Sequence, residues 1–365
     1  MQIPEPKALT AQDVQRVYEV MLGRPPESTS VVAHHLSGVG SLADLVRNIA
    51  ASAEFAAHAG LNAATATTVT PESPFWHFHA NVDVRGIIQS HAKAQPAPLA
   101  GHYVNFLGAA VPTKVMTFLN ERGDQVDPVP IPANYHADMA EWGGALRAVD
   151  LAKGSFTMIE LGCGWACWMT NTGVAARARG LQVQLIGIEG DPTHLQYARE
   201  TMAVNGFSTS QFTLLPGVAA AGKGFALFPT REVGSEHWGS TPIFGASLEE
   251  SDKAVASGKF ESLKMVPLSD AIGKRAHIDL LHIDIQGGEA DLIAASIDLL
   301  SERVAYIVIG THSRQLEGRL MDLLLGAGWL LEIERPAIIQ LPNGAPQTTV
   351  DGVQAWRNPR LLPTV

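Results

Sequence analysis

The chain has 365 residues, of which 46% are hydrophobic and 17% are charged, and its formal net charge is −10. This length predicts two domains or one large domain with an appendage, and the composition excludes an intrinsically disordered chain. The negative charge argues against binding to the backbone of a nucleic acid.

The first 60 residues are predicted to form a small helical domain. Apolar side chains between Val14 and Leu22 recur at helical spacing, after a potential N-cap at Thr10. A second helical pattern runs over residues 41–60. Residues 61–73 are small and polar and contain a proline near their end, which is typical of a linker.

Residues 74–150 form a connecting segment. It begins with an aromatic-rich stretch that continues into a predicted helix, and prolines punctuate its middle. A second helix is predicted from His136 onward, with Met139 and Trp142 on one apolar stripe, although Gly143 and Gly144 interrupt the pattern. Trp142 fits either a core position or a wall of a ligand site.

From residue 151 to residue 365, short apolar strands alternate with helices. Strands are predicted at 156–161, 183–189, 211–215, 277–285 and 304–310, with helices at 170–180, 192–206 and 313–329. The stretches 330–341 and 348–356 flank Asn343-Gly344, which is compatible with a hairpin turn. The alternation predicts a doubly wound, mainly parallel α/β sheet with an antiparallel edge strand.

A glycine turn follows the first of these strands. The segment Gly162-Cys163-Gly164-Trp165 comes directly after "MIEL", and glycine lets the backbone pass close to a ligand. Glu189 closes the second strand and is followed by Gly190 and Asp191. A carboxylate there can accept hydrogen bonds from both ribose hydroxyls of a nucleoside. These residues predict an adenosine cofactor, and the alternative is a turn that only packs helix on strand.

Two details bear on which cofactor this is. A dinucleotide site usually has a third glycine at the position that Cys167 occupies. Glu160 precedes the glycines, and its carboxylate would repel a pyrophosphate. A carboxylate at this place suits a cofactor with an ammonium and a sulfonium group, which favours S-adenosylmethionine.

The glycine turn, Glu189 and the segment "LLHIDIQGGEADLI" together resemble the class I S-adenosylmethionine-dependent methyltransferases. The segment itself resembles the FkbM-type family, in which Asp-x-x-Gly-x-Glu follows an apolar strand, and Asp284, Gly287 and Glu289 fill those places. The resemblance covers about residues 150–335. It implies a seven-stranded Rossmann-like sheet and a cofactor that leaves as S-adenosylhomocysteine. This family commonly has lysine where His282 stands, so a role for that lysine does not carry over.

The helical domain resembles a bacterial module of unknown function through Tyr18, "LGRPP" and "SAEF". That module often accompanies glycan-modifying or surface-associated enzymes. The resemblance therefore implies a glycan acceptor and a protein partner bound through residues 9–59.

Catalytic residues are expected where parallel strands end. The carboxyl ends of neighbouring strands meet at one edge of the sheet, which places Asp284 and His312 on the same rim. A hydroxyl acceptor needs a general base, and the unperturbed pKa of histidine makes His312 the first candidate. Asp284 is predicted to orient that base, to hold the ammonium group of the cofactor or to be the base itself. The alternatives are a capping role for His312 and a structural role for Asp284.

Two neighbours of this pair are assigned structural roles. His282 is expected to be a buried, hydrogen-bonded residue, and Glu289 is expected to be an acid in the first turn of a helix. His282, Asp284 and His312 are chemically eligible metal ligands, but nothing in their spacing fixes a coordination geometry, so no metal is predicted.

Acceptor contacts are proposed in two segments. His237 and Trp238 lie in a glycine-rich stretch between two predicted strands, where Trp238 is placed to stack on a sugar. Tyr135 and His136 precede the first strand, and in the class that the chain resembles, such a segment covers the methionine end of the cofactor. A packed surface loop is the alternative for the first segment.

Other functions remain open at this point. A nucleotide-dependent oxidoreductase fits a similar sheet, although Glu160 and the missing third glycine count against it. A binding or scaffold protein with an inactive catalytic domain is the third hypothesis. We find no apolar run long enough to span a membrane and no signal peptide, and we expect a cytoplasmic protein that binds no nucleic acid and forms a homo-oligomer or a monomer. Cys163 and Cys167 are too few for a disulfide framework.

Overall fold

The computed structural model describes residues 9–39, 41–50, 52, 54–55, 73–123, 125–230 and 239–363. The chain divides into two compact units, Met1–Pro74 and Phe75–Val365. Within the described ranges, no helix combines the length and the apolar character that are needed to cross a bilayer.

The described part of the first unit is helical. It contains α1 (Ala11–Leu22), α2 (Thr29–Gly38) and α3 (Leu42–Ala50). Thr10 caps α1 through a reciprocal pair of hydrogen bonds with Asp13, as its sequence predicts. Helix α2 is not predicted from the sequence, because none of its side chains is fully buried and its apolar residues form no continuous stripe.

The second unit is built on one large sheet. Its strand order is β1-β12-β15-β11-β10-β4-β5-β6. These strands are β1 (His79–Ala80), β4 (Ser155–Leu161), β5 (Gln182–Glu189), β6 (Phe212–Pro216), β10 (Leu280–Ile283), β11 (Tyr306–Thr311), β12 (Leu330–Arg335) and β15 (Gly352–Arg357). Neighbours from β11 to β6 pair in parallel, which confirms the predicted mainly parallel sheet.

Two details of the sheet differ from the expectation. Among the described residues the sheet has eight strands rather than seven, because the two-residue strand β1 adds to the edge of β12. The antiparallel strand β15 lies inside the sheet, between β11 and β12, and the antiparallel edge is β1. The hairpin around Asn343-Gly344 explains this position. It brings β15 back along β12 and into the space beside β11.

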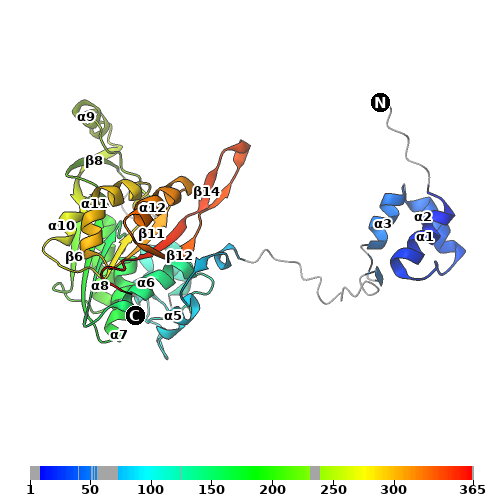
Figure 1. Cartoon of the computed structure of the whole chain (residues 1–365), viewed down its shortest axis with the longest axis horizontal. Helices are drawn as coiled ribbons and strands as arrows, with labels where there is room; N and C mark the ends of the chain where they lie inside the picture. The colour runs from blue at the N-terminus through cyan, green and yellow to red at the C-terminus, as the bar shows by residue number, and fades with distance from the viewer. Residues whose placement is uncertain are drawn as a thin grey trace. The chain divides into compact units, whose positions relative to one another are not determined.

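Helices cover both faces of the sheet. They are α5 (Val84–Ser90), α6 (Met139–Leu151), α7 (Cys167–Ala178), α8 (Pro192–Val204), α10 (Leu268–Ile272), α11 (Glu289–Arg303) and α12 (Arg314–Gly326). The first four share one apolar core with the sheet, and the last three share a second core on the opposite face. Figure 1 shows α11 and α12 side by side on that second face.

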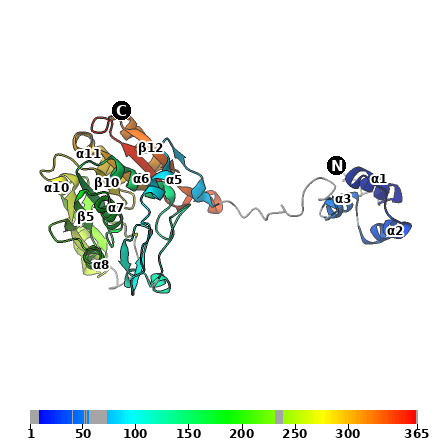
Figure 2. The same ribbon diagram turned by 90° about the horizontal axis from the view of Figure 1, so that it is seen from below.

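Helix α6 lies in the centre of the first core. Its two glycines are compatible with a helix because neighbours approach them closely. A Cβ atom on Gly143 would lie 2.7 Å from Val84 of α5, and one on Gly144 would lie 2.9 Å from Ala355 of β15. Figure 2 shows α5 packed along α6. Trp142 is fully buried here, so it belongs to the core.

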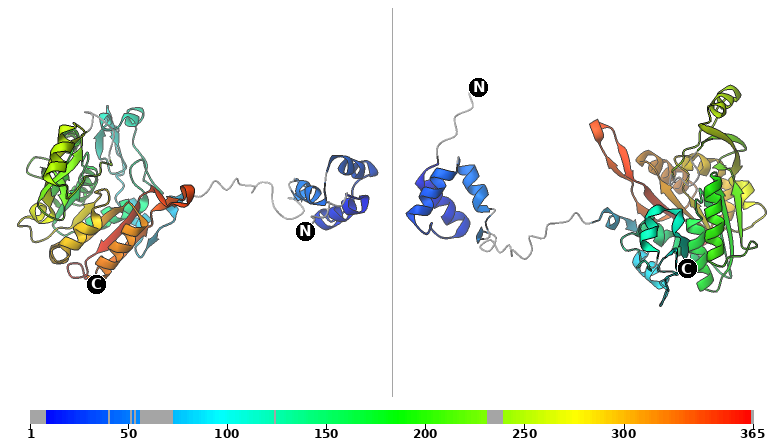
Figure 3. Two further views of the ribbon diagram at one scale, coloured as in Figure 1. Left: turned by 90° about the horizontal axis from the view of Figure 1, so that it is seen from above. Right: turned by 180° about the vertical axis from the view of Figure 1, so that it is seen from behind.

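Smaller elements surround the sheet. They comprise β2 (His102–Val104), β3 (Ala110–Pro112), β7 (Val218–Ala220), β8 (Gly224–Pro229), α9 (Leu248–Ala256), β9 (Phe260–Pro267), β13 (Ile338–Gln340) and β14 (Gln347–Val350), with 3-10 turns η2 (Pro74–Trp76), η3 (Thr113–Val115), η4 (Thr117–Arg122) and η5 (Pro342–Gly344). Strands β7, β9 and β8 form their own sheet in the segment between β6 and β10. Figure 3 shows α9 and the β13–β14 hairpin projecting from the same end of the unit.

Candidate functional site

A cavity of about 470 Å³ lies at the carboxyl ends of the parallel strands. Its walls come from the turn after β4, the end of β5, the exit of β10 and the segment 133–141. Residues of the β7–β9 segment and of the junction between β14 and β15 complete the lining. Of the two projecting elements of Figure 3, the β13–β14 hairpin reaches the cavity through Val350, and no residue of α9 is in the lining.

The glycine turn packs directly on the exit of β10. Gly162 has a φ of +73°, and a Cβ atom there would lie 2.2 Å from the main-chain oxygen of Asp284. Gly164 also has a positive φ, and Cys163 fits because Gly187 leaves space for its sulfur. Trp165 lines the cavity but is 3% exposed and packs in a separate apolar cluster with Tyr103 and Leu119.

Glu160 caps the helix that follows the turn. Its Oε1 accepts a hydrogen bond from the Trp168 amide at 3.0 Å, and its Oε2 accepts one from the Met169 amide at 2.8 Å. These amides open α7, which has no side-chain cap at Ala166. Burial raises the pKa of Glu160 to about 7, against the opposite effect of His282 and the amides. Both oxygens of Glu160 therefore already accept hydrogen bonds. An ammonium group in direct contact with Glu160, as the sequence predicts, would have to share these oxygens with the two amides.

Glu189 and Asp191 organise the end of β5. Glu189 is 8% exposed and accepts hydrogen bonds from the amides of Gly164 and Asp191, at 2.9 and 2.8 Å. The strand-end acid and the glycine turn therefore meet, as predicted for a nucleoside site. Asp191 uses Oδ1 to cap α8 at the amides of Thr193 and His194. Gly190 lies against Phe228, which forms part of the cavity wall.

Asp284 and His312 meet at the rim, as the sequence predicts. The Asp284 side chain is 49% exposed and faces the cavity, and its Oδ1 lies 3.2 Å from Nε2 of His312. The Nδ1 atom of the same ring lies 2.7 Å from Oε1 of Glu289. Burial would lower the pKa of His312, but these two carboxylates raise it to about 10.

This geometry argues against His312 as the general base. A histidine with this pKa carries its proton at neutral pH, and both of its ring nitrogens are held by carboxylates. Loss of hydration would raise the pKa of Asp284, but the hydrogen bond and the positive charge of His312 lower it further than that. Asp284 is therefore ionised. Glu289 stands in the first turn of α11, as expected, but it is fully buried and holds His312.

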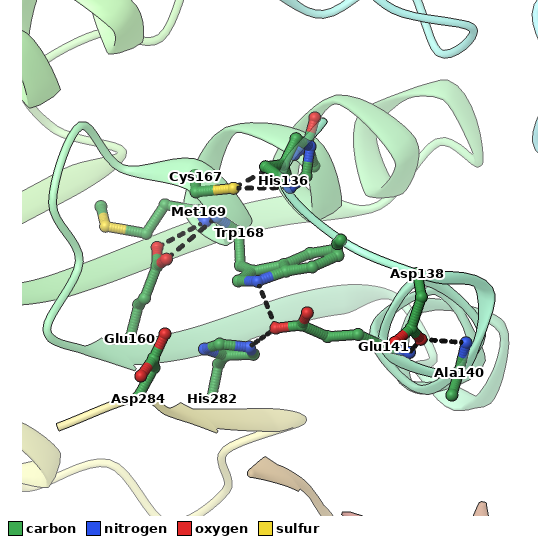
Figure 4. A network of polar contacts seen from close by, with 12 residues as sticks. His136, Asp138, Ala140, Glu141, Glu160, Cys167, Trp168, Met169, His282 and Asp284 are labelled. Atoms are coloured by element: carbon green, nitrogen blue, oxygen red, sulfur yellow. Dashed lines mark hydrogen bonds and ion pairs between the residues drawn. The ribbon is translucent and has the colours of Figure 1, made fainter. Parts of the chain in front are cut away.

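A second polar network lies deeper in the cavity and involves a residue that the sequence does not single out. The Oε1 atom of Glu141, on α6, accepts a hydrogen bond from Nε1 of Trp168 at 3.0 Å and lies 2.9 Å from Nε2 of His282 (Figure 4). His282 is 1% exposed. The prediction of a buried, hydrogen-bonded His282 is therefore confirmed.

The segment 133–141 covers this network. Its Tyr135 and His136 both line the cavity. His136 lies 3.5 Å from the sulfur of Cys167 and contacts the rings of Trp142, Trp165 and Trp168. Burial lowers the pKa of His136 to about 3, and the nearby His282 adds to that effect, so the ring is neutral. His237 and Trp238, the other predicted acceptor contacts, lie outside the described residues.

Arg335 is a further lining residue that sequence reasoning missed. Its side chain is buried at the end of β12, where Nε binds the Asp138 carboxylate and the guanidinium also donates to the main-chain oxygen of Asp351. Asp138 in turn caps α6 through the amides of Ala140 and Glu141. Asp138 followed by Glu141 is a helix-start signal, but nothing in the sequence links it to a residue 197 positions away.

The three eligible metal ligands do not form one group. His282 binds Glu141, whereas His312 binds Asp284 and Glu289. Over the ranges that the structure describes, no group of three or more histidine, cysteine, aspartate or glutamate residues is arranged to hold a metal ion.

Comparison with known proteins identifies one related sequence. The chain is 47% identical over 262 residues to a protein of Jannaschia sp. (strain CCS1) named "Putative methyltransferase", and the match covers 72% of this chain and 94% of that protein. No family model matches the chain.

Solved structures also align with the chain. Methyltransferase FkbM from Methylobacillus flagellatus KT has a TM-score of 0.37 and 11% identity, over 66% of this chain and 69% of its own. The precorrin-6y C5,15-methyltransferase from Geobacter metallireducens GS-15 has a TM-score of 0.33 and 10% identity, over 58% and 86%. None of these likenesses bears on the activity of this chain.

Proposed function

The chain belongs to the methyltransferase family of its Jannaschia relative, and from this premise we propose that it transfers a methyl group from S-adenosylmethionine to a hydroxyl group of a sugar or glycoconjugate. The observation that carries the proposal is the position of Asp284. This residue leaves the strand beside the glycine turn, and its ionised carboxylate is open to the cavity.

The residues of the cavity fit the proposed cofactor. Gly162 and Gly164 both line the cavity, and Glu189 stands beside them as an acceptor for ribose hydroxyls. Val218, Ala219 and Phe228 offer apolar surface for a purine ring. When bound, S-adenosylmethionine supplies an electrophilic methyl carbon on its sulfonium group.

Asp284 has two functions in the proposed reaction. Its carboxylate accepts a hydrogen bond from the acceptor hydroxyl and so orients the oxygen, and alignment of the reacting atoms lowers much of the barrier. It would then take the hydroxyl proton as the methyl group passes from the sulfonium sulfur to the oxygen, because the O–H group becomes strongly acidic at that stage, and S-adenosylhomocysteine would be the leaving group. His312 keeps Asp284 ionised and fixes its position.

The choice of a sugar hydroxyl rests on the polar groups at the rim. The side chains of Asp284 and Asp351 are 49% and 57% exposed, and the Gln286 amide lies beside them in the cavity wall. Carboxylate and amide groups are suited to neighbouring hydroxyls. The motif from Asp284 to Glu289 further supports an enzyme of the FkbM type.

Calorimetry tests the cofactor half of this proposal. We expect the wild-type chain to bind S-adenosylmethionine and S-adenosylhomocysteine and to show no binding of NAD. Binding of NAD alone would contradict the proposal.

Transfer of labelled methyl groups to a panel of glycosides tests the acceptor half. Replacement of Asp284 by Asn should lower the rate by about 100-fold or more, while the affinity for S-adenosylhomocysteine changes far less. The matched control is Asp291→Asn, which alters an exposed carboxylate on α11 that pairs with Arg319 of α12. Full transfer by Asp284→Asn, or label found only on nitrogen or carbon acceptors, would refute the proposed role.

A further inference from the structure

His282 has one polar atom whose function the fold does not explain. Its Nε2 atom faces Glu141, whereas Nδ1 is buried and has no hydrogen-bond partner among the described residues. Most buried polar atoms have a partner, and His282 lines the cavity. Figure 4 shows that this second nitrogen is directed toward the side on which Glu160 and Asp284 lie.

The contact with Glu141 sets the chemistry of the ring. The Oε1 atom of Glu141 already acts as an acceptor for the N–H group of Trp168, so in its contact with His282 the hydrogen belongs to Nε2 of the ring. Trp168 donates to the same Oε1 and fixes the carboxylate from the other side. When the ring is neutral, Nδ1 therefore has a free lone pair. When the ring is protonated, Nδ1 has a buried N–H group without an acceptor.

Carboxylates surround the ring. Glu160 on β4 is in register with His282, Asp284 follows two residues later, and Glu141 comes from α6. These acids raise the pKa of His282, although burial alone would lower it. The other titratable groups nearby are His136, which is neutral, and the Cys167 thiol, whose pKa is raised by burial. Val308, the neighbour on β11, has no titratable group.

We propose that Nδ1 of His282 binds the ammonium group of the methionine portion of the cofactor. The ring accepts a hydrogen bond from the ammonium group through the lone pair of Nδ1, so a ring that carries a proton on Nδ1 in the free protein must release it to solvent when the cofactor binds. The ammonium group of the cofactor thus takes the place of the positive charge of the imidazole ring between Glu160 and Asp284. The buried N–H group that had no acceptor is then no longer present. The inference rests on the proposed function, because it requires S-adenosylmethionine or S-adenosylhomocysteine as the ligand.

This arrangement allows the site to select ligands that carry an amino group. A nucleoside without an amino group leaves Nδ1 unpartnered and leaves the carboxylates without a ligand cation, and both effects cost binding free energy. The ligand is therefore recognised at its amino-acid end as well as at its adenosine end. The fixed position of Glu141 makes His282 a preformed acceptor, so little rotamer entropy is lost on binding.

The experiment counts the protons released on binding. Calorimetry of the full chain near pH 7, in two buffers with different ionisation enthalpies, measures this number directly. We compare S-adenosylhomocysteine with 5′-methylthioadenosine, which lacks the amino-acid end. The expected result is a net release of protons with the first ligand and no release with the second. This comparison needs no variant, so it tests the inference even where a substitution prevents folding.

A substitution then assigns the proton to His282. His282→Gln should abolish the release and reduce the preference for S-adenosylhomocysteine over 5′-methylthioadenosine by about 10-fold or more. The matched control is His91→Gln, which changes another buried histidine, 2.9 Å from the carboxylate of Asp150 and not in the lining of this cavity. The control should retain both the release and the preference.

Three outcomes overturn the inference. The first is an absence of proton release when S-adenosylhomocysteine binds to the wild-type chain. The second is an unchanged proton count and preference in His282→Gln. The third is a wild-type chain that binds neither ligand, and this result alone would overturn the proposed function as well.

Discussion

Asp284 and His312 form an ion pair at the mouth of the cavity, with 3.2 Å between Oδ1 and Nε2. Glu289 holds the opposite side of the imidazole at 2.7 Å. The histidine is therefore a cation that holds two carboxylates together, and Asp284 is the member of the group that has an exposed face. Proton transfer at this rim is expected at the carboxylate rather than at the imidazole.

The first prediction concerns stability and pH. The carboxylates raise the pKa of His312 from 6.5 to about 10, so the folded chain binds more protons than the unfolded chain between these values. The stabilisation is complete below pH 6.5 and is lost as the pH rises through about 10, by at most about 1.4 kcal/mol per pH unit. The wild-type chain should therefore be more stable than His312→Gln at pH 7, and the difference should shrink toward pH 10.

Urea unfolding at pH 7, 8.5 and 10 measures this difference. The exposed His77 provides the control, since His77→Gln should follow the wild-type chain at each pH. A gap between His312→Gln and wild type that stays constant over this range would show that the ion pair does not titrate as described.

The second prediction concerns the glycine turn. A Cβ atom on Gly162 would lie 2.2 Å from the main-chain oxygen of Asp284, so Gly162→Ala must displace one of the two segments. Gly154 has nearly the same φ, +74° against +73°, but nothing lies within 4 Å of its added Cβ atom. Gly154→Ala should therefore cost only the strain of the positive φ, about 1 kcal/mol.

Thermal unfolding and binding of S-adenosylhomocysteine separate the two glycine variants. Gly162→Ala should lower the melting temperature more than Gly154→Ala and should also weaken binding, whereas Gly154→Ala should bind normally. Equal losses of stability, with binding intact in both variants, would mean that the close contact is relieved without consequence.

Sequence patterns predict the strands and turns whose own residues carry the signal, either as an apolar run or as a turn motif. The apolar runs that become β4, β10 and β11 and the turn signals around Asn343-Gly344 are sufficient for the parallel sheet and its hairpin. The two-residue strand β1 has no periodicity to detect, because its side chains are exposed and its pairing comes from β12. The position of β15 inside the sheet depends on contacts with β11, which no local pattern encodes.

The site is predictable to a similar degree. Glu189 and Asp284 are found because both follow strands, and parallel strands place their ends together. Glu141 and Arg335 are missed because each depends on a partner far away in the chain, His282 and Asp138. The role of His312 changes for the same reason. Its pKa depends on the buried Glu289, which the sequence presents as an ordinary first-turn acid.

The third prediction contrasts two caps. Glu160 uses both carboxylate oxygens on the amides of α7, whereas Asp191 uses one oxygen on the amides of α8. An amide side chain has only one oxygen, so Glu160→Gln loses one bond and places an NH2 group against a backbone N–H. We expect Glu160→Gln to lower the free energy of unfolding by about 1–3 kcal/mol and Asp191→Asn to lower it by less than about 1 kcal/mol.

Urea unfolding at neutral pH measures both cap variants. If Asp191→Asn is the more destabilised of the two, the hydrogen-bond pattern does not explain the stability of these helices.

The fourth prediction concerns Glu189. Its carboxylate is 8% exposed and stands beside the amide of Gly164 in the cavity wall. Glu189→Gln keeps the shape but removes the charge that would accept the ribose hydroxyls, so the affinity for S-adenosylhomocysteine should fall by roughly 10- to 100-fold. Calorimetry checks this, with Glu200→Gln as the control, because Glu200 pairs with Lys114 outside the cavity lining. Wild-type affinity in Glu189→Gln would place the ribose elsewhere.

The contact between Gly162 and the main chain of Asp284 has a consequence for how such an enzyme can change. This contact between backbone atoms joins the glycine turn, on the proposed cofactor side of the cavity, to the rim at Asp284. The spacing between the glycine turn and the rim is therefore independent of side-chain rotamers. The wall of residues 133–141 and the projecting β13–β14 hairpin are joined to the rim through side chains, by the contact of Glu141 with His282 and by the hydrogen bond that Thr348 donates to the main-chain oxygen of His312. Substitutions there can reshape the space for an acceptor while the reacting geometry stays constant, which makes those two segments the natural starting points for engineering a new acceptor preference.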